Sequence, residues 1–158
     1  MSWEVVCIIF FVLKGYFGII LDSRRKEVYE VKLDNELQVI TPNEPGILGR
    51  VLGTLANAGV NLRALNAFSE GKKGVFLVVT SDNTKAQKYL KILGYQIRSN
   101  PVVTVLVEDR IGAGSEIGAL LGNAVIDVDY CYGSSAGVGK VLLVFKTSDD
   151  KKAVETLR

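Results

Sequence analysis

The stretch TPNEPGILGRVLGTLANAGVNL, residues 41–62, carries the clearest structural pattern of the sequence. Its apolar positions 47, 48, 51, 52 and 55 follow the spacing of an amphipathic helix, with a Pro-Gly turn before them and Gly59 as the helix stop. Gly49 and Gly53 lie inside this helix, where each costs about 1 kcal/mol relative to alanine. We therefore expect a close approach at these glycines, either by a ligand or by another helix.

The residues around this stretch predict one βαββαβ unit. Strands are expected at residues 37–41, 60–68, 75–80 and 95–98, and Pro45 is expected in the first turn of the first helix. A second helix is predicted after a cap at Ser81 or Asp82, and Gly94 ends it. This order is that of ferredoxin-like folds, in which two helices cover one face of a four-stranded antiparallel sheet.

The same pattern returns later in the chain. Aligning Gly46 with Gly112 gives an offset of 112 − 46 = 66, at which Leu55 meets Leu121, and Val78 meets Val144 without a gap. We therefore predict an α+β protein with two ferredoxin-like βαββαβ units in tandem, antiparallel sheets and helices on one face. The units are expected at residues 36–98 and 102–158, and the fourth strand of the second unit is expected to be missing.

Composition excludes several functions. The 158 residues include 19 Lys and Arg, 17 Asp and Glu and no His, which removes the commonest general base and metal ligand. Cys7 and Cys131 fit no metal or redox spacing and indicate buried free thiols of a reducing compartment, the cytoplasm. No catalytic constellation is present, so we expect no enzyme activity, no metal and no cofactor. A net charge of +2 does not favour nucleic-acid binding.

The N-terminal segment, residues 1–26, breaks the pattern. Residues 5–21 (VVCIIFFVLKGYFGIIL) are almost wholly apolar but contain Lys14, and a bilayer span needs about 20 apolar residues. Three interpretations stay open: a membrane anchor, an extra β-strand, or an extension outside the natural fold. Only the first would tether the protein to a membrane. We expect residues before about Lys26 to be dispensable for folding of the two units.

The segment NEPGILGRVLGTLANAGVNL resembles the ACT domain family, a regulatory module that binds amino acids. The resemblance extends over about residues 36–158 and is more specific in the first unit. More closely, the chain is similar to tandem ACT proteins without a catalytic domain. The resemblance implies that two modules associate side by side with merged sheets, and that a small effector binds at their interface beside the first turn.

The residues of the first turn suit an amino acid. Backbone N–H groups at the helix start can bind a carboxylate, and asparagine amides can bind both the carboxylate and the α-ammonium group. The predicted ligand-binding residues are Asn43, Glu44, Pro45, Gly46, Ile47, Leu48, Asn61 and Leu62. Alternatively, Asn43 is a turn residue and Asn61 orders a loop.

A second site is predicted at the matching positions of the second unit, Asp109, Gly112 and Asp127. The replacement of Pro45 by Ile111 and of Gly59 by Val125 argues against an equivalent site there. On the second unit's first helix, glycines at 114, 118 and 122 form a stripe that predicts a close contact with another helix.

We therefore predict a non-catalytic regulatory module that binds a small amino acid and forms a homodimer. The alternative is a structural oligomerisation module without a ligand. The βαββαβ order also occurs in RNA-recognition domains, but Val75 and Val79 stand where such domains need aromatic side chains. A small enzyme and an RNA-binding domain are therefore less favoured.

Overall fold

The computed structural model of the protein describes residues 30–137 and 139–158, so the expectations for residues 1–26 lie outside the described part. Six strands and four helices follow one another in these residues: β1 (Glu30–Pro42), α1 (Ile47–Asn57), β2 (Leu62–Glu70), β3 (Lys73–Thr80), α2 (Asn83–Ile92), β4 (Gln96–Glu108), α3 (Ala113–Asn123), β5 (Val128–Gly137), β6 (Lys140–Thr147) and α4 (Asp150–Leu157). None of these helices is long and apolar enough to cross a membrane.

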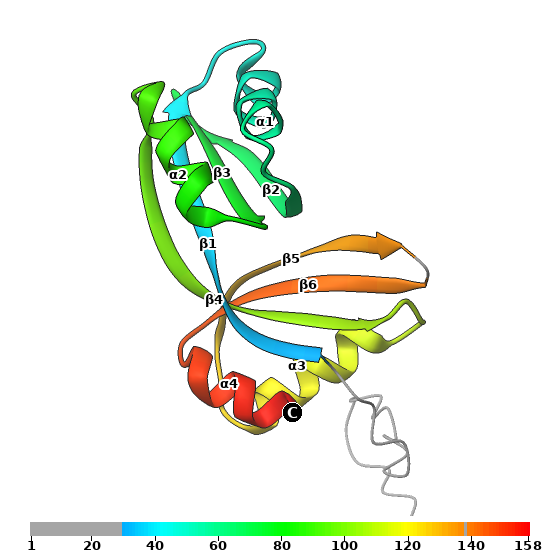
Figure 1. The fold of residues 1–158 in the computed structure, drawn as a ribbon. Coiled ribbons are helices and arrows are strands. Elements are labelled where there is room, and N and C mark those ends of the chain that lie inside the picture. Colours follow the sequence, from blue (N-terminus) through cyan, green and yellow to red (C-terminus); the bar gives the residue numbers. More distant parts are fainter. Residues whose placement is uncertain (1–29, 138) are drawn as a thin grey trace, which may run out of the picture.

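All six strands form one antiparallel sheet in the order β2-β3-β1-β4-β6-β5. Figure 1 shows that β1 and β4 run through both halves of this sheet, with α1 and α2 over one half and α3 and α4 over the other. The two βαββαβ units predicted from the sequence are therefore present, and they share their two longest strands.

The fourth strand of the second unit, expected to be missing, is the first part of β1. Residues 30–35 of β1 pair with residues 101–106 of β4, and Val31, directly opposite Val105, is buried in the core of the second unit. Each unit thus has the same strand order, with its fourth strand beside its first. The expectation failed because β1 and β4 are 13 residues long, and each contributes one end to either unit.

The apolar core consists of three clusters, of which one joins the two units. One lies beneath α1 and α2, and a second lies beneath α3 and α4. The third lies on the opposite face of the sheet, which we call the open face, and it joins both units: Ala64, Val79, Val102, Leu142 and Val144. Strands β2 and β5, at the two edges of the sheet, contact each other on this side. The units are therefore packed together through the open face.

The repeat offset changes by one residue along the chain. The helix caps Asp82 and Asp149 each accept a bond from the backbone three residues later, and 149 − 82 = 67. The predicted pairing of Val78 with Val144 is therefore wrong: Val78 faces the helices, whereas Val144 belongs to the open face. A shift of one residue turns a strand's side chains to the other face. The register of β5 shifts between Ser135 and Gly137, just before the β5–β6 turn.

Candidate functional site

The first turn, residues 43–46, connects β1 to α1 and presents an open helix start. Gly46 is the N-cap residue with φ 86°, and Ile47 N–H donates to Glu44 O at 3.2 Å. Pro45 therefore precedes the helix and does not lie in its first turn as expected. A Cβ placed on Gly46 would meet no heavy atom within 4 Å. The backbone at this helix start is thus accessible to a small molecule.

Side chains at the first turn hold its shape. The backbone N–H of Asn43 donates to Lys72 O at 2.9 Å, and its side-chain amide donates to Gly71 O at 3.4 Å. Arg50 forms an ion pair with Glu44 at 2.7 Å. Asn43 therefore fixes the turn against the β2–β3 hairpin, and its side-chain amide remains exposed.

Asn61 lies at the opposite end of the first unit. Its N–H donates to Ser81 Oγ at 3.0 Å, just beyond the end of β3, whereas the first turn contacts Lys72 just before the start of β3. The eight residues of β3 separate these two ends by roughly 26 Å at about 3.3 Å per residue. The structure thus brings residues 43–48 together and places Asn61 and Leu62 elsewhere. One amino acid cannot contact both places in a single chain.

The second turn, residues 109–112, has the same backbone but a different electrostatic surface. Gly112 is the N-cap residue of α3 with φ 92°, and Ala113 N–H donates to Arg110 O at 3.3 Å. Arg110 and Glu116 form an ion pair whose charges are reversed relative to Glu44 and Arg50. Oε1 of Glu116 lies 3.9 Å from where a Cβ on Gly112 would stand. The protein's own carboxylate therefore occupies the surroundings of the second helix start.

The other two positions of interest in the second unit differ in kind. Asp127 repeats the backbone pattern of Asn61, since its N–H donates to Ser148 Oγ at 3.1 Å. Val125 replaces Gly59 at the end of the helix and keeps its left-handed backbone, with φ 56° against 65°. For a β-branched residue this conformation is strained. The second unit therefore keeps the fold but not the residues that suit it best.

The glycines inside α1 and α3 do not pack against anything in the described residues. A Cβ placed on any of them would meet no heavy atom within 4 Å: Gly49, Gly53, Gly114, Gly118 and Gly122. The expected contact with another helix is therefore absent within the described chain. Both glycine-bearing helix faces remain available to a second molecule.

A buried polar network between the units was not foreseen from the sequence. Glu36 of β1 is 0 % exposed and accepts hydrogen bonds from the hydroxyls of Tyr130 at 2.5 Å and Tyr132 at 2.9 Å, both on β5. Burial, together with the neighbouring Glu36, raises the pKa of both tyrosines above the usual value. Glu36 lies in a polar stretch of β1 whose sequence indicates no partner, so only the tertiary structure shows its partners. Cys131, which lies between the two tyrosines in β5, is exposed, so the expectation of a buried thiol is wrong there.

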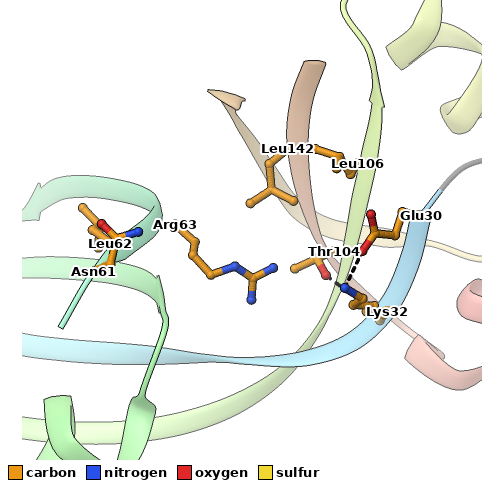
Figure 2. A pocket seen from close by; sticks show the side chains of 8 residues that line it. All are labelled: Glu30, Lys32, Asn61, Leu62, Arg63, Thr104, Leu106 and Leu142. Atoms are coloured by element: carbon orange, nitrogen blue, oxygen red, sulfur yellow. Dashed lines mark hydrogen bonds and ion pairs between the residues drawn. The ribbon is translucent and has the colours of Figure 1, made fainter. Parts of the chain in front are cut away.

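A pocket of about 360 Å³ opens on the open face between the two units. Figure 2 shows its lining: Asn61, Leu62 and Arg63 from one side, and Glu30, Lys32, Thr104, Leu106 and Leu142 from the other. Asn61 and Leu62 thus line this pocket and not the first turn.

The fold and the open first turn define a protein of two ferredoxin-like units with an exposed helix start in the first. Residues 36–94 match the sequence model of the ACT domain family. Among curated proteins, none matches this chain.

Several solved structures share the fold. A protein from Bacteroides thetaiotaomicron is 24% identical with a TM-score of 0.73, over 80% of this chain and 88% of that one. The regulatory subunit of aspartate kinase from Thermus thermophilus, in a ligand-free form, is 14% identical with a TM-score of 0.62, over 82% and 93%. Aspartate kinase from Clostridium acetobutylicum is 17% identical with a TM-score of 0.55, over 82% of this chain and 33% of the enzyme. These likenesses establish the tandem fold.

Proposed function

We propose that the protein is a non-catalytic regulatory module that binds a small amino acid at the first turn. The ligand's carboxylate lies at the backbone of Gly46, Ile47 and Leu48. It accepts hydrogen bonds from the N–H groups of Gly46 and Leu48, because the N–H of Ile47 already donates to Glu44 O. The observation that carries this proposal is the difference between the two turns: the first is open above Gly46, whereas Glu116 lies beside Gly112 in the second. A helix start attracts an anion, and only the first lacks an acidic residue in its first helical turn.

The proposed site is completed by a second copy of the chain. Asn61, assigned to the ligand's ammonium group, lies at the far end of its own unit from the first turn. Strand β2 is an edge strand, and it begins beside Asn61 and ends at the hairpin that holds Asn43. Two copies paired antiparallel along β2 would therefore bring Asn61 of one copy close to the first turn of the other. A two-fold dimer would contain two such sites.

A structural oligomerisation module remains the second candidate. Its support is the exposed edge of β2, where Phe68 is 48% exposed, together with the accessible glycines of α1. An unpaired edge strand with an exposed aromatic side chain favours association whether or not a ligand binds. Both candidates predict a dimer, so sedimentation at micromolar concentration should show at least two copies, and a monomer would contradict both.

A thermal-shift screen of the twenty amino acids separates the two candidates. A ligand present at 100 times its dissociation constant adds about 2.7 kcal/mol to the free energy of unfolding. The regulatory proposal predicts that at least one amino acid raises the melting temperature with a saturable concentration dependence. If none of the twenty does so, the oligomerisation candidate replaces it.

Mixing two variants tests whether the site spans two copies. Gly46→Asp places a carboxylate at the anion site, and Asn61→Ala removes the proposed ammonium partner. In a mixed dimer, one site carries both changes and the other carries neither. Calorimetry of the mixture should therefore show a phase with the unmodified protein's affinity, which neither variant shows alone. A site within one chain would give no such phase.

A further inference from the structure

The pocket between the two units carries features of a second small-molecule site. Its volume of about 360 Å³ lies within the range of ligand pockets, which combine apolar walls with a few converging polar groups. Leu62, Leu106 and Leu142 form the apolar part, and the last two continue into the buried cluster of the open face. The pocket therefore has an apolar base beneath charged groups.

The charged groups converge on this apolar base from both units. Lys32 and Glu30 of β1 pair with each other, with 57% and 55% of their side chains exposed. Arg63, at the start of β2, contacts Asp34 at 2.6 Å through one nitrogen, and its guanidinium has further N–H donors. Figure 2 shows this guanidinium extending across the pocket toward Lys32 and Thr104. A molecule between them would touch both cations at once.

The remaining N–H donors of Lys32 and Arg63, both already paired with one acidic residue each, suit a carboxylate. The hydrogen bond from Lys32, followed by the positive charges of Lys32, Lys140 and Arg63, lowers the pKa of Glu30. Glu30 therefore stays ionised and holds Lys32 at the pocket rim. Arginine and lysine together bind a carboxylate well, because arginine presents a planar pair of donors and lysine adds a mobile point charge.

We propose that this pocket binds a small organic carboxylate with an apolar side chain. The carboxylate lies between Arg63 and Lys32, and the side chain contacts Leu106 and Leu142. Because Arg63 belongs to the first unit and Leu142 to the second, the bound molecule bridges the units and stabilises their packing. This pocket lies away from the first turn of the same chain, and all its lining residues come from one copy. It shares Asn61 and Leu62 with the proposed first-turn site.

Two probes identify the chemistry: leucine, and the α-keto acid with the same side chain. Both carry the carboxylate and the apolar group, but only leucine carries an ammonium group that Glu30 could bind. Either probe should produce saturable shifts at the backbone amides of Lys32, Arg63, Thr104 and Leu142 in a nitrogen-labelled full-length chain. If the ammonium group is recognised, Glu30→Gln should lower the affinity for leucine more than the affinity for the keto acid. An equal effect on the two affinities means that the pocket recognises the carboxylate and not the ammonium group.

Variants test whether the probe binds in this pocket. Lys32→Gln should lower the affinity for the bound probe about tenfold. Lys88→Gln makes an equal change of charge on the exposed side of α2 and should not change this affinity. Arg63→Lys keeps the charge next to Asp34 and should still weaken binding, since the planar donor pair is lost. Gly46→Asp should leave the shifts at these amides unchanged. The proposal is overturned if neither probe gives saturable shifts, if the shifts lie only at residues 43–48, or if Lys32→Gln and Lys88→Gln behave alike.

Discussion

The first and second turns have the same backbone and opposite charge arrangements. Gly46 and Gly112 take φ values of 86° and 92° at the N-caps of α1 and α3. Glu44 and Arg50 form the ion pair in one turn, and Arg110 and Glu116 form it in the other. Because the two charges are exchanged, the acidic residue Glu116 lies within the first turn of α3, where its negative charge interacts favourably with the helix dipole. The same fold therefore leaves one helix start open and places a carboxylate beside the other.

The largest expected effect concerns the strand that the two units share. A chain shortened to begin at Glu36 loses residues 30–35, which leaves the edge of β4 unpaired and removes Val31 from the core of the second unit. Burial of a valine alone contributes about 1.5–3 kcal/mol. We expect the amides of β4 and β6 to lose hydrogen-exchange protection, while those of β3 keep theirs.

The matched control begins at Glu27 and keeps β1 intact. The expectation that residues before about Lys26 are dispensable predicts unchanged exchange protection in both units. If this longer chain also loses the second unit, the apolar N-terminal segment is part of the fold. If the chain that begins at Glu36 stays fully protected, the shared strand is not essential.

A smaller effect distinguishes the two helix stops. Gly59 and Val125 both have a left-handed backbone, which costs an L-residue about 1–2 kcal/mol. We expect Val125→Gly to stabilise the protein by about 1 kcal/mol and Gly59→Val to destabilise it by at least as much. Val125 is 87% exposed, so little buried contact is lost on its replacement. Urea denaturation measures both, and a destabilised Val125→Gly variant would show that the valine side chain has a role of its own.

The smallest effect at neutral pH lies in the network that joins the units. The pKa values of Tyr130 and Tyr132 are raised in the folded protein above about 10, the value expected in the unfolded chain. Their contribution to stability is therefore fully present below pH 10 and is lost as the pH rises beyond it. The free energy of unfolding should fall above about pH 10. It should fall less in the double variant that carries both Tyr130→Phe and Tyr132→Phe. Identical pH profiles would contradict the assignment.

Local patterns predicted the elements well and the long-range pairings poorly. The cap, expected at Ser81 or Asp82, and the stop at Gly59 are predicted from short motifs whose partners lie within a few residues. The structure confirms Asp82 as the cap and Gly59 as the stop. The shared strands were missed because the apolar alternation is interrupted by the polar stretch around Glu36. Its buried carboxylate has partners on β5, 94 and 96 residues away.

The same limit applies to the candidate site. The sequence indicated a carboxylate-binding turn from its Pro-Gly helix start, and the structure shows that this turn is accessible. The sequence also showed that Asp109 and Asp127 replace asparagines in the second unit, but it did not show the role of Glu116. That role depends on how Arg110 and Glu116 meet across the turn, which a spacing of six residues does not reveal. The place of Asn61 required the direction of β3, which only the fold supplies.

Calorimetry on Gly46→Asp and Gly112→Asp tests the central claim most directly. Both changes place a carboxylate at a left-handed N-cap, so their strain is matched, and circular dichroism checks folding. With an amino acid found by the screen, Gly46→Asp should abolish binding and Gly112→Asp should leave affinity nearly unchanged. Asn61→Ala should weaken binding by about 1–2 kcal/mol, and Asp127→Ala by less. Unchanged affinity in both Gly46→Asp and Asn61→Ala would contradict the claim and leave oligomerisation as the role of the first unit.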